Sequence, residues 1–364
     1  MGTTLGIVGL PNVGKSTLFN ALTHGHAPVA PYPFTTTDRN VGVAQVEDPR
    51  LARLASLIPH DKLIPTTIEF VDIAGLIRGA HQGEGLGNQF LSHIFAVDAI
   101  LHVVRCFDDP NIPHAMGEVD PVRDVEVIHT ELMLKDLELL DRRLEKDRKL
   151  AKGGDKQAQA LAEKLTVWKQ AIEQGTPIRK LALTAAEHPR AYGVELLSSK
   201  PVIYVANVDE ASLNTPPASV ERLAQVANQD QALLIVVCAK LEAELVELEA
   251  ADQAAMMQEL GLAQSALPRV ISQGYQLLNL ITFFTMASRI LQAWTVARGT
   301  KAPQAAGVIH TDFERQFIRA EVISVEALIA CGGEAQARTK GLLRLEGKDY
   351  VVQDGDVIHF RIGQ

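Results

Sequence analysis

Residues 9–17 read GLPNVGKST, and this loop constrains the fold more than any other stretch of the chain. It follows the apolar run TLGIVGL and precedes STLFNALT, in which apolar residues recur at helical spacing. A glycine loop between a strand and a helix is the context in which Gly-x4-Gly-Lys-Ser holds phosphate groups. Its glycines let several backbone N–H groups face one anion, and the helix N-terminus adds further donors. The loop therefore predicts a nucleoside-phosphate site.

The side chains of this loop have separate expected roles. Lys15 is expected to reach the β- and γ-phosphates, and the Ser16 hydroxyl is expected to ligate Mg2+. The residues predicted to surround the phosphates are Asn12, Val13, Gly14, Lys15, Ser16 and Thr17.

Two later motifs distinguish a nucleotide switch from a kinase or a transporter. FVDIAG is a strand ending in Asp-x-x-Gly, in which Asp72 would hold a water on Mg2+ and the Gly75 N–H would contact the γ-phosphate. Between the motifs lies YPFTTTDRN, from which we expect Thr36 to close over Mg2+ and the γ-phosphate. A loop threonine is otherwise ordinary turn material, but the order of the three motifs favours a switch.

The stretch NVDE, residues 207–210, stands where switch GTPases carry Asn-Lys-x-Asp at the end of a strand. In that motif the aspartate accepts two hydrogen bonds from guanine. Here Val208 replaces the lysine, and the Glu210 carboxylate lies one methylene further out. Losing one bidentate base contact costs about 1–3 kcal/mol of discrimination. The sequence therefore predicts weakened guanine selectivity, without by itself predicting adenine.

The position directly after Asp-x-x-Gly is a second departure from switch GTPases, which often carry there a glutamine that orients the attacking water. Leu76 occupies this position and can neither donate nor accept a hydrogen bond. Either turnover is slow or another group orients the water. The glycine-rich loop that follows is of the kind that a ligand can order.

Composition limits the partners and the compartment. A formal net charge of -9 argues against wrapping of nucleic acid by the whole chain, although it leaves room for a local basic patch. The three cysteines have neither metal-ligand nor redox-motif spacing, which indicates reduced thiols. The N-terminus lacks a secretory pattern, and no apolar stretch reaches the length of a membrane span, so the expected location is cytoplasmic.

The chain divides into three expected domains. Short apolar runs alternate with helical patterns, as in a mostly parallel α/β sheet, and this nucleotide domain is expected over residues 1–125 and 199–278. Residues 126–198 are expected to be an inserted, charge-rich helical hairpin that turns at KGGDK. Residues 279–364 are expected to form a small α+β module ending in a strand, a tight Asp-Gly turn and a strand.

The hairpin has two open interpretations. A charged helical hairpin is usually a solvated face, but one that projects from a nucleotide domain is also a candidate docking surface.

Taken together, these motifs resemble one family along essentially the whole chain. GIVGLPNVGKSTLFNALT, YPFTT, FVDIAGL, GEGLGNQFLSHI, HVVRCF, HTDFERQFIRAEVI and GKDYVVQDGDVIHF resemble the YchF family of Obg-like ATPases. The resemblance implies an α/β P-loop NTPase G domain, an inserted α-helical hairpin domain and a C-terminal α+β TGS domain of β-grasp type.

The resemblance also implies an activity and its residues. It implies a Mg2+-dependent hydrolase with slow intrinsic turnover that prefers ATP to GTP, with adenine contacted partly by the backbone of Val208. Asn207 and Glu210 match the family's altered specificity motif. His114, in the Pro- and Gly-containing loop FDDPNIPHAMGEVDP, matches a histidine proposed to replace the catalytic glutamine, and Asn12 matches a K+ ligand of related NTPases.

The implied partner is the ribosome, either its large subunit or the whole particle, with no membrane and no DNA. The hairpin segment RRLEKDRKLAKGGDK is locally basic and could contact ribosomal RNA or simply keep the protein in solution. Three interpretations therefore stay open. The chain is an ATP-preferring switch acting on a ribosomal partner, a nucleotide-gated binding protein whose hydrolysis is incidental, or a guanine-nucleotide switch that tolerates Glu210.

Overall fold

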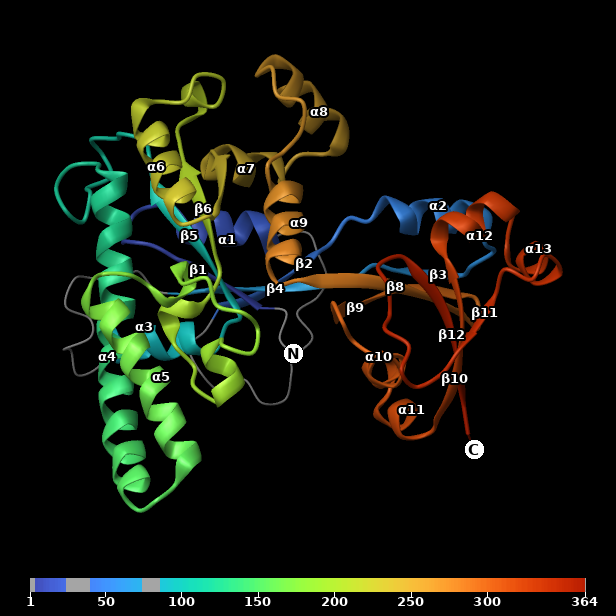
Figure 1. The fold of residues 1–364 in the computed structure, drawn as a ribbon. Coiled ribbons are helices and arrows are strands. Elements are labelled where there is room, and N and C mark those ends of the chain that lie inside the picture. Colours follow the sequence, from blue (N-terminus) through green and yellow to red (C-terminus); the bar gives the residue numbers. More distant parts are fainter. Residues whose placement is uncertain (1–3, 24–39, 74–85, 364) are drawn as a thin grey trace. The chain divides into compact units, whose positions relative to one another are not determined.

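The computed structural model describes residues 4–23, 40–73 and 86–363 (Figure 1). The chain forms two compact units. The first consists of the described residues of Gly2–Gly42 and Glu69–Leu267, and the second of those of Val43–Ile68 and Pro268–Gln364.

A six-stranded sheet forms the centre of the first unit, and five of its strands run parallel to one another. Its strands, in spatial order, are β2 (Asn40–Gln45), β4 (Thr67–Asp72), β1 (Thr4–Val8), β5 (Ala99–Arg105), β6 (Val202–Asn207) and β7 (Leu233–Val237). β5 and β6 are buried at every residue, as expected for strands covered on both faces. The carboxyl ends of β1, β4, β5 and β6 lie at one edge of the sheet, where open α/β sheets bind ligands.

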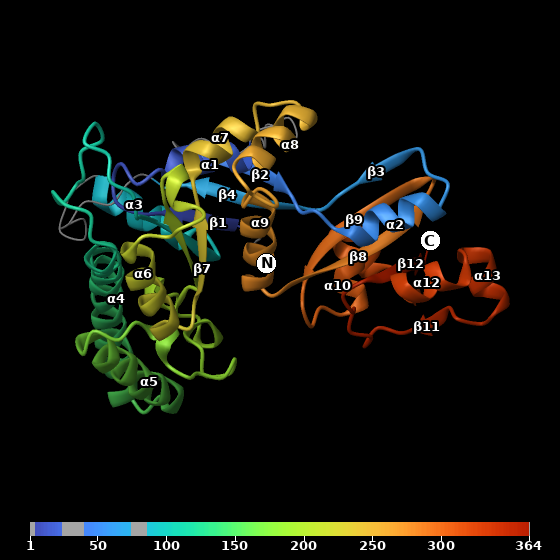
Figure 2. The same cartoon turned by 90° about the horizontal axis from the view of Figure 1, so that it is seen from above.

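Helices cover both faces of this sheet. Figure 2 shows α1 and α7 together on one side of the strands and α4 and α6 on the other. The helices of the unit outside the hairpin are α1 (Lys15–Thr23), α3 (Leu86–Phe95), α6 (Ala218–Gln229), α7 (Ala239–Leu245) and α8 (Ala250–Glu259). The next helix, α9 (Leu267–Leu277), belongs to the second unit from Pro268 onward.

The predicted helical hairpin is present. It consists of α4 (Pro121–Lys152) and α5 (Lys156–Glu173), and its turn uses Gly154 at a φ of 94°. Aspartates cap both helices, because Asp120 accepts a hydrogen bond from Val122 N–H and Asp155 accepts from the first turn of α5. The apolar seam between the helices is formed by Leu140, Leu144, Ala162, Leu165, Trp168 and Ile172.

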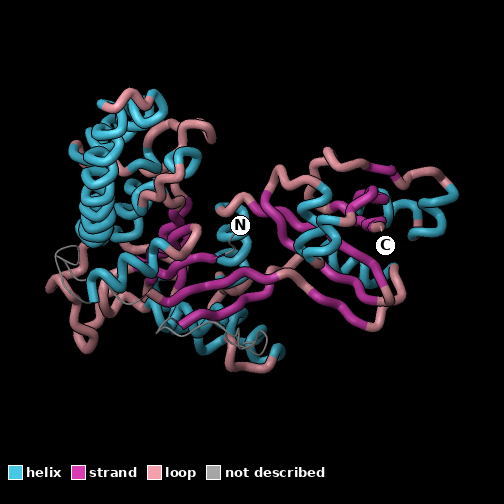
Figure 3. The backbone as a smooth tube through the Cα atoms, turned by 90° about the horizontal axis from the view of Figure 1, so that it is seen from below, coloured by secondary structure: helices cyan, strands magenta, loops and turns pink. Residues whose placement is uncertain are grey.

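The second unit is built on a mixed sheet, whose strands appear in Figure 3. In spatial order they are β11 (Arg344–Glu346), β10 (Phe317–Ser324), β12 (Asp356–Ile362), β8 (Leu280–Ala287), β9 (Ile290–Ala297) and β3 (Lys62–Ile64). β8 and β9 form a hairpin through Ser288 and Arg289, both of which have positive φ, as the two-residue turns that match strand twist require. The helices are α2 (Pro49–Leu57), α10 (Ala302–Ile309), α11 (Thr311–Arg315), α12 (Val325–Cys331) and α13 (Glu334–Thr339).

The expected tight hairpin at the end of the chain is wrong. β11 and β12 do not pair with each other; instead, each pairs with β10 from opposite sides. Gly355 does adopt a positive φ of 86°, but its N–H donates to Thr282 O on β8. The Asp-Gly pair therefore anchors β12 against a more distant strand, which a local turn pattern does not reveal.

Residues 43–68 belong to the second unit, although the rest of that unit begins only at residue 268. Leu51 and Leu54 of α2 lie in one apolar cluster with Phe284 and Leu291, and β3 pairs in parallel with β9. The Arg50 guanidinium donates to both Asp354 carboxylate oxygens. The three-domain boundaries stay a prediction, and the structure adds that an N-terminal segment completes the C-terminal module.

Leu54→Ala tests this assignment, because Leu54 has no exposed surface and packs only within that cluster. We expect the second unit to lose about 2–5 kcal/mol of unfolding free energy. The measurement is urea unfolding followed by Trp294 fluorescence in a Trp168→Phe background. Arg53→Ala, at an exposed position of the same helix, is the control. An unchanged midpoint for Leu54→Ala would separate α2 from the module.

Candidate nucleotide-binding and hydrolysis site

The phosphate loop connects β1 to α1, and two of its glycines are required by close approach. A Cβ at Gly9 would lie 2.4 Å from Val103 O on β5. A Cβ at Gly14, whose φ is 96°, would lie 2.3 Å from the Asn207 side-chain nitrogen. Glycine at both positions therefore lets the loop lie directly on the ends of β5 and β6.

Asn207 joins the phosphate loop to the predicted base site. Its Nδ2 donates to Val13 O at 2.8 Å, and its Oδ1 accepts from Ala239 N–H at 2.9 Å. The side chain is buried and uses both ends of its amide. The first residue of NVDE therefore fixes the spacing between the phosphate loop and the start of α7.

Lys15 is 7% exposed, and its Nζ donates to Leu10 O at 2.8 Å, across the loop that it belongs to. Burial lowers the pKa of Lys15 to about 8, although the nearby Asp72 carboxylate acts in the opposite direction. The amine therefore carries its charge at neutral pH and lies at the centre of the loop, where phosphate oxygens are expected.

Ser16 and Asp72, the predicted Mg2+ residues, lie side by side although they are distant in sequence. Ser16 Oγ donates to Asp72 Oδ2 at 2.8 Å. Asp72 Oδ1 is buried and has no hydrogen-bond partner among the described residues. A hydroxyl beside a carboxylate oxygen without a partner suits a hard cation that prefers oxygen ligands, so these residues fit Mg2+.

Three predicted positions lie outside the described residues. Thr36, Gly75 and Leu76 fall in residues 24–39 and 74–85, and their roles stay predictions.

A pocket of about 580 Å³ opens beside the phosphate loop. It is lined by Asn12, Gly14, Thr17, Phe107, Asp108, Asp109, Ile112, Asn207, Val208, Asp209, Glu210, Ala211, Cys238, Ala239, Lys240 and Leu241. This volume is in the range of pockets that bind cofactor-sized molecules. The fold thus brings the phosphate loop and NVDE into one cavity, as the sequence predicted.

Within NVDE, two polar groups are already used by the protein. Val208 N–H donates to Val237 O at 2.9 Å, and the Asp209 carboxylate caps the turn that follows by accepting from Ser212 N–H. The groups of NVDE that remain free to read a base therefore include the Val208 carbonyl and the exposed Glu210 carboxylate.

His114 lies on the loop after β5, but its ring is held by neighbouring residues. Its Nε2 lies 2.8 Å from Asp124 Oδ2, and its Nδ1 accepts from Met116 N–H at 3.1 Å. Both the His114 and Asp124 side chains are 3% exposed. These contacts fix the proton on Nε2 and leave neither ring nitrogen available to a water. The adjacent residue reaches the phosphate loop, because Pro113 O accepts from Asn12 Nδ2 at 3.1 Å.

Arg105 is a site residue that the sequence reasoning missed. Its guanidinium, 1% exposed, donates to Phe107 O, Asp109 O and Ile112 O. It also lies 4.4 Å from the centre of the Phe107 ring. Arg105 therefore shapes the wall of the pocket and the start of the His114 loop. An arginine ending a buried strand whose other residues, except His102, are apolar was the available signal.

The fold and this site define a P-loop nucleotide-binding protein. Residues 4–140 match the 50S ribosome-binding GTPase family, and residues 280–363 match the YchF-GTPase C-terminal family, described as a protein of unknown function. The chain is 50% identical over 363 residues to the "Ribosome-binding ATPase YchF" of Bacillus subtilis, and the match covers 99% of both chains. It is 48% identical over 360 residues to the protein of that name from Escherichia coli O157:H7, again covering 99% of each.

A solved structure agrees with these matches. The YchF GTPase of Schizosaccharomyces pombe superposes with a TM-score of 0.87 at 37% identity, covering 98% of this chain and 97% of that one. The chain belongs to the YchF family. The resemblance drawn from the motifs and the predicted fold class, a P-loop G domain with additional domains, are both confirmed.

Lys15 generates a pH prediction. As pH rises through about 8, its amine loses its charge, so phosphate binding comes to require uptake of a proton. We expect the association constant for a non-hydrolysable ATP analogue to fall by up to tenfold per pH unit above about 8. Lys15→Ala should weaken binding by at least about 100-fold at neutral pH. Calorimetric titration from about pH 7 to pH 9.5 measures both. A flat profile, or unchanged affinity in the variant, would remove Lys15 from the site.

Proposed function

We propose that this protein is a Mg2+-dependent ATPase that acts as a ribosome-binding molecular switch. One observation carries the proposal: the phosphate loop and NVDE line the same pocket, and the Asn207 amide holds them together. The relatives named above are called ribosome-binding ATPases, which supports the same activity and partner for this chain. Within the described residues, none of the helices has the length and apolar character needed to cross a membrane. We propose a cytoplasmic location on the strength of the ribosomal partner.

The hydrogen-bonding groups of NVDE favour adenine over guanine. Because the Val208 N–H is bound to Val237, the backbone at this position offers an acceptor, its carbonyl. The adenine amino group donates to such an acceptor, whereas guanine presents a carbonyl oxygen at the equivalent position of its ring. Two acceptors facing each other leave buried polar groups unpaired, which costs binding energy. Glu210 replaces the shorter aspartate that fits the guanine edge.

Replacing the two residues of NVDE that differ from the guanine motif tests base selection. We expect the wild-type protein to bind a non-hydrolysable ATP analogue more tightly than its GTP counterpart. Val208→Lys with Glu210→Asp should move the ratio toward GTP by about tenfold, in line with one restored bidentate contact. Calorimetry with both analogues in Mg2+ measures the ratio.

Two further variants control this experiment. Glu210→Asp alone spares the buried Val208 and so guards against misfolding. Asp209→Asn is the second control. It also removes a carboxylate of the motif, but this carboxylate accepts a hydrogen bond from Ser212 N–H and so is not available to a base. A ratio that stays constant in both Glu210 variants would contradict this account of specificity.

Hydrolysis needs a group that orients water, and His114 is the candidate. In this structure the ring is directed to Asp124 with both nitrogens bonded, so His114 must leave Asp124 before it can act on a water at the γ-phosphate. The Mg2+ ion, held by Ser16 and Asp72, would neutralise charge on the phosphates. Lys15 supplies a further positive charge at the same oxygens. Slow turnover follows from a resting position that keeps the water-orienting group occupied.

The contact between His114 and Asp124 gives a kinetic prediction. His114→Ala should lower turnover by about 100-fold, the scale of a single acid–base group, while ATP affinity stays constant. Asp124→Asn removes the charge that holds the ring, so turnover should rise several-fold. The double variant should match His114→Ala. Single-turnover hydrolysis with excess protein measures the three rates.

Asp124 also contacts Arg123, which allows a control. Arg123→Ala removes that ion pair without touching His114, and we expect turnover to stay close to the wild-type rate. If Asp124→Asn is as slow as His114→Ala, Asp124 supports His114 in catalysis rather than restraining it.

The held position of His114 also favours the second interpretation, in which bound ATP gates a partner and hydrolysis is incidental. Unchanged turnover in His114→Ala would select that alternative. K+ at Asn12 and contact with ribosomal RNA stay predictions. The Asn12 side chain is exposed, and its Nδ2 donates a hydrogen bond to Pro113 O.

A further inference from the structure

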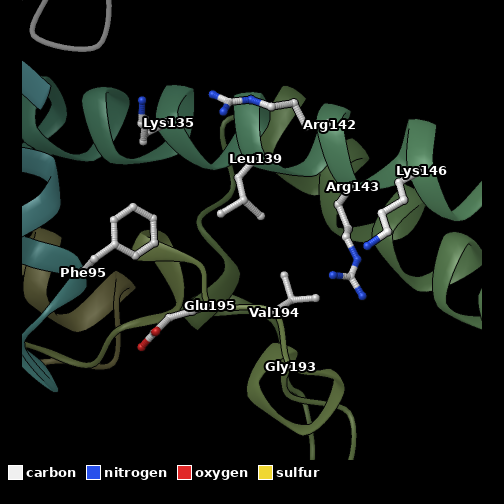
Figure 4. Close-up of a pocket in the computed structure, with 9 residues that line it drawn as sticks. All are labelled: Phe95, Lys135, Leu139, Arg142, Arg143, Lys146, Gly193, Val194 and Glu195. Atoms are coloured by element: carbon white, nitrogen blue, oxygen red, sulfur yellow. The ribbon is translucent and has the colours of Figure 1, made fainter.

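One side of the nucleotide pocket is a loop rather than a helix or a strand. The groove of about 650 Å³ in Figure 4 shows the contrast, because one of its walls is α4, whose backbone is held by its own hydrogen bonds. The loop after β5, residues 107–114 and here called the His114 loop, has little support of this kind. Its backbone bonds to itself from Ile112 N–H to Asp109 O. Side chains must therefore fix its position.

Arg105, the last residue of β5, supplies such support from the strand. Its Nε donates to Phe107 O at 3.1 Å, its Nη1 to Ile112 O at 2.9 Å and its Nη2 to Asp109 O at 3.2 Å. All three carbonyls belong to residues that line the nucleotide pocket. One buried side chain therefore holds the backbone of this pocket wall at three points.

The chemistry of the guanidinium group suits this role. The group is planar and carries several N–H donors in a fixed fork, so it can bind separate carbonyls in set directions at the same time. Arg105 is 1% exposed, and its contacts are the three carbonyl oxygens and the Phe107 ring. A buried cation that lost such contacts would have nothing to replace its water shell, which is costly. The loop and the cation therefore hold each other in place.

The backbone stays tied up to the residue before His114. Arg105 holds the Ile112 carbonyl, and the next residue is Pro113, whose ring restricts φ to about −65°. Pro113 O in turn accepts from Asn12 Nδ2 of the phosphate loop at 3.1 Å. The two carbonyls that precede His114 are thus bound, one to β5 and the other to the phosphate loop. The starting point of the His114 side chain is therefore set relative to the phosphate loop.

We propose that Arg105 is a positioning residue for hydrolysis, which acts through the backbone of the His114 loop. It fixes the point from which the His114 ring turns from Asp124 to the phosphates, so that the ring moves while the loop stays in place. In this role the guanidinium acts on the loop and not on the nucleotide. Without it the ring would occupy a wider range of positions, few of which place a nitrogen beside the attacking water.

This proposal rests on the proposed function, because the position of His114 matters only if His114 acts on ATP. The two can fail separately. A wild-type chain that does not hydrolyse ATP would reject the proposed function and, with it, any part of Arg105 in hydrolysis. A wild-type rate that does not depend on Arg105 would reject the role of Arg105 alone.

Arg105→Lys is the test variant. It keeps the positive charge but replaces the fork by one ammonium group, which cannot reach three separate carbonyls. We expect single-turnover hydrolysis to slow about tenfold, as a small displacement of a water-orienting group predicts. The affinity for a non-hydrolysable ATP analogue should fall less than about threefold, because the phosphate loop and NVDE are unchanged. A loss of affinity as large as the loss of rate would make Arg105 a structural part of the pocket wall and overturn the proposal.

A double variant separates positioning of His114 from other effects. In a His114→Ala background, Arg105→Lys should slow hydrolysis by less than about twofold more, because the ring that Arg105 positions is absent. Losses that multiply would mean that Arg105 acts on the nucleotide directly, and they would overturn the proposal. Unchanged hydrolysis in Arg105→Lys alone would overturn it as well.

Amide hydrogen exchange gives a readout that needs neither ATP nor hydrolysis. The Asn111 and Ile112 amides both bond to Asp109, whose carbonyl also binds Arg105. In Arg105→Lys, the peptide that contains these amides should exchange at least about tenfold faster than in the wild-type protein. Equal exchange in the two proteins would show that the loop holds itself, which contradicts the proposal.

Arg222→Lys is the matched control. It makes the same substitution on α6, at a side chain that is 49% exposed and pairs with Asp120 rather than with the His114 loop. We expect its hydrolysis rate and its loop exchange to stay within about twofold of the wild-type values, since exposed ion pairs contribute little.

Discussion

The Asn207 side chain is the contact on which the nucleotide site depends. It occupies the space that a Cβ at Gly14 would need, and it bonds the loop at Val13 and the first residue of α7 at the same time. Three segments far apart in sequence therefore keep a fixed spacing, since the amide has one shape and is buried. The distance between the phosphate end and the base end of the pocket is set by this residue, whichever base is bound.

Within NVDE, the first residue has a structural role that does not depend on the later positions. The asparagine of NVDE performs the structural task, so the later positions are free to change without loss of the loop. Asp209 caps the turn that follows and Val208 is buried in the wall of the pocket, so in the proposed function base recognition falls to a backbone carbonyl and to Glu210. Under this proposal, selection among bases rests on two groups, and both are hydrogen-bond acceptors.

Local patterns in the sequence predicted much of this structure. The loop GLPNVGKST, the carboxylate of FVDIAG and NVDE meet as expected, because parallel strands bring the residues after their carboxyl ends to one edge. The helical hairpin and its Gly-Gly turn were also readable from spacing, but the exact face of α5 that packs on α4 was not. Val167 is 59% exposed, whereas the adjacent Trp168 is buried. Adjacent residues on a helix differ by about 100° in direction, so an error of one position reverses exposure.

Contacts between distant segments were not predictable in this way. Nothing in residues 43–68 reveals that α2 packs on β8 and β9, because the pairing depends on surfaces formed by residues after 280. The Asp-Gly turn itself forms, because Asp356 N–H donates to Gln353 O, but the predicted hairpin pairing is wrong, since β10 lies between β11 and β12. His114 was identified from its resemblance, but its engagement with Asp124 depends on where α4 begins, and helix starts are among the least certain features of a sequence.

The helix α4 has a mechanical consequence. It runs without interruption from Asp124, in its first turn, to Lys146 near its far end, about 33 Å at 1.5 Å per residue. A helix of this length that is packed along one side behaves as a lever whose short arm carries Asp124. A tilt that displaces the long arm by several ångströms moves the first turn by a fraction of an ångström. That is enough to stretch a hydrogen bond of 2.8 Å and too little to disturb the sheet.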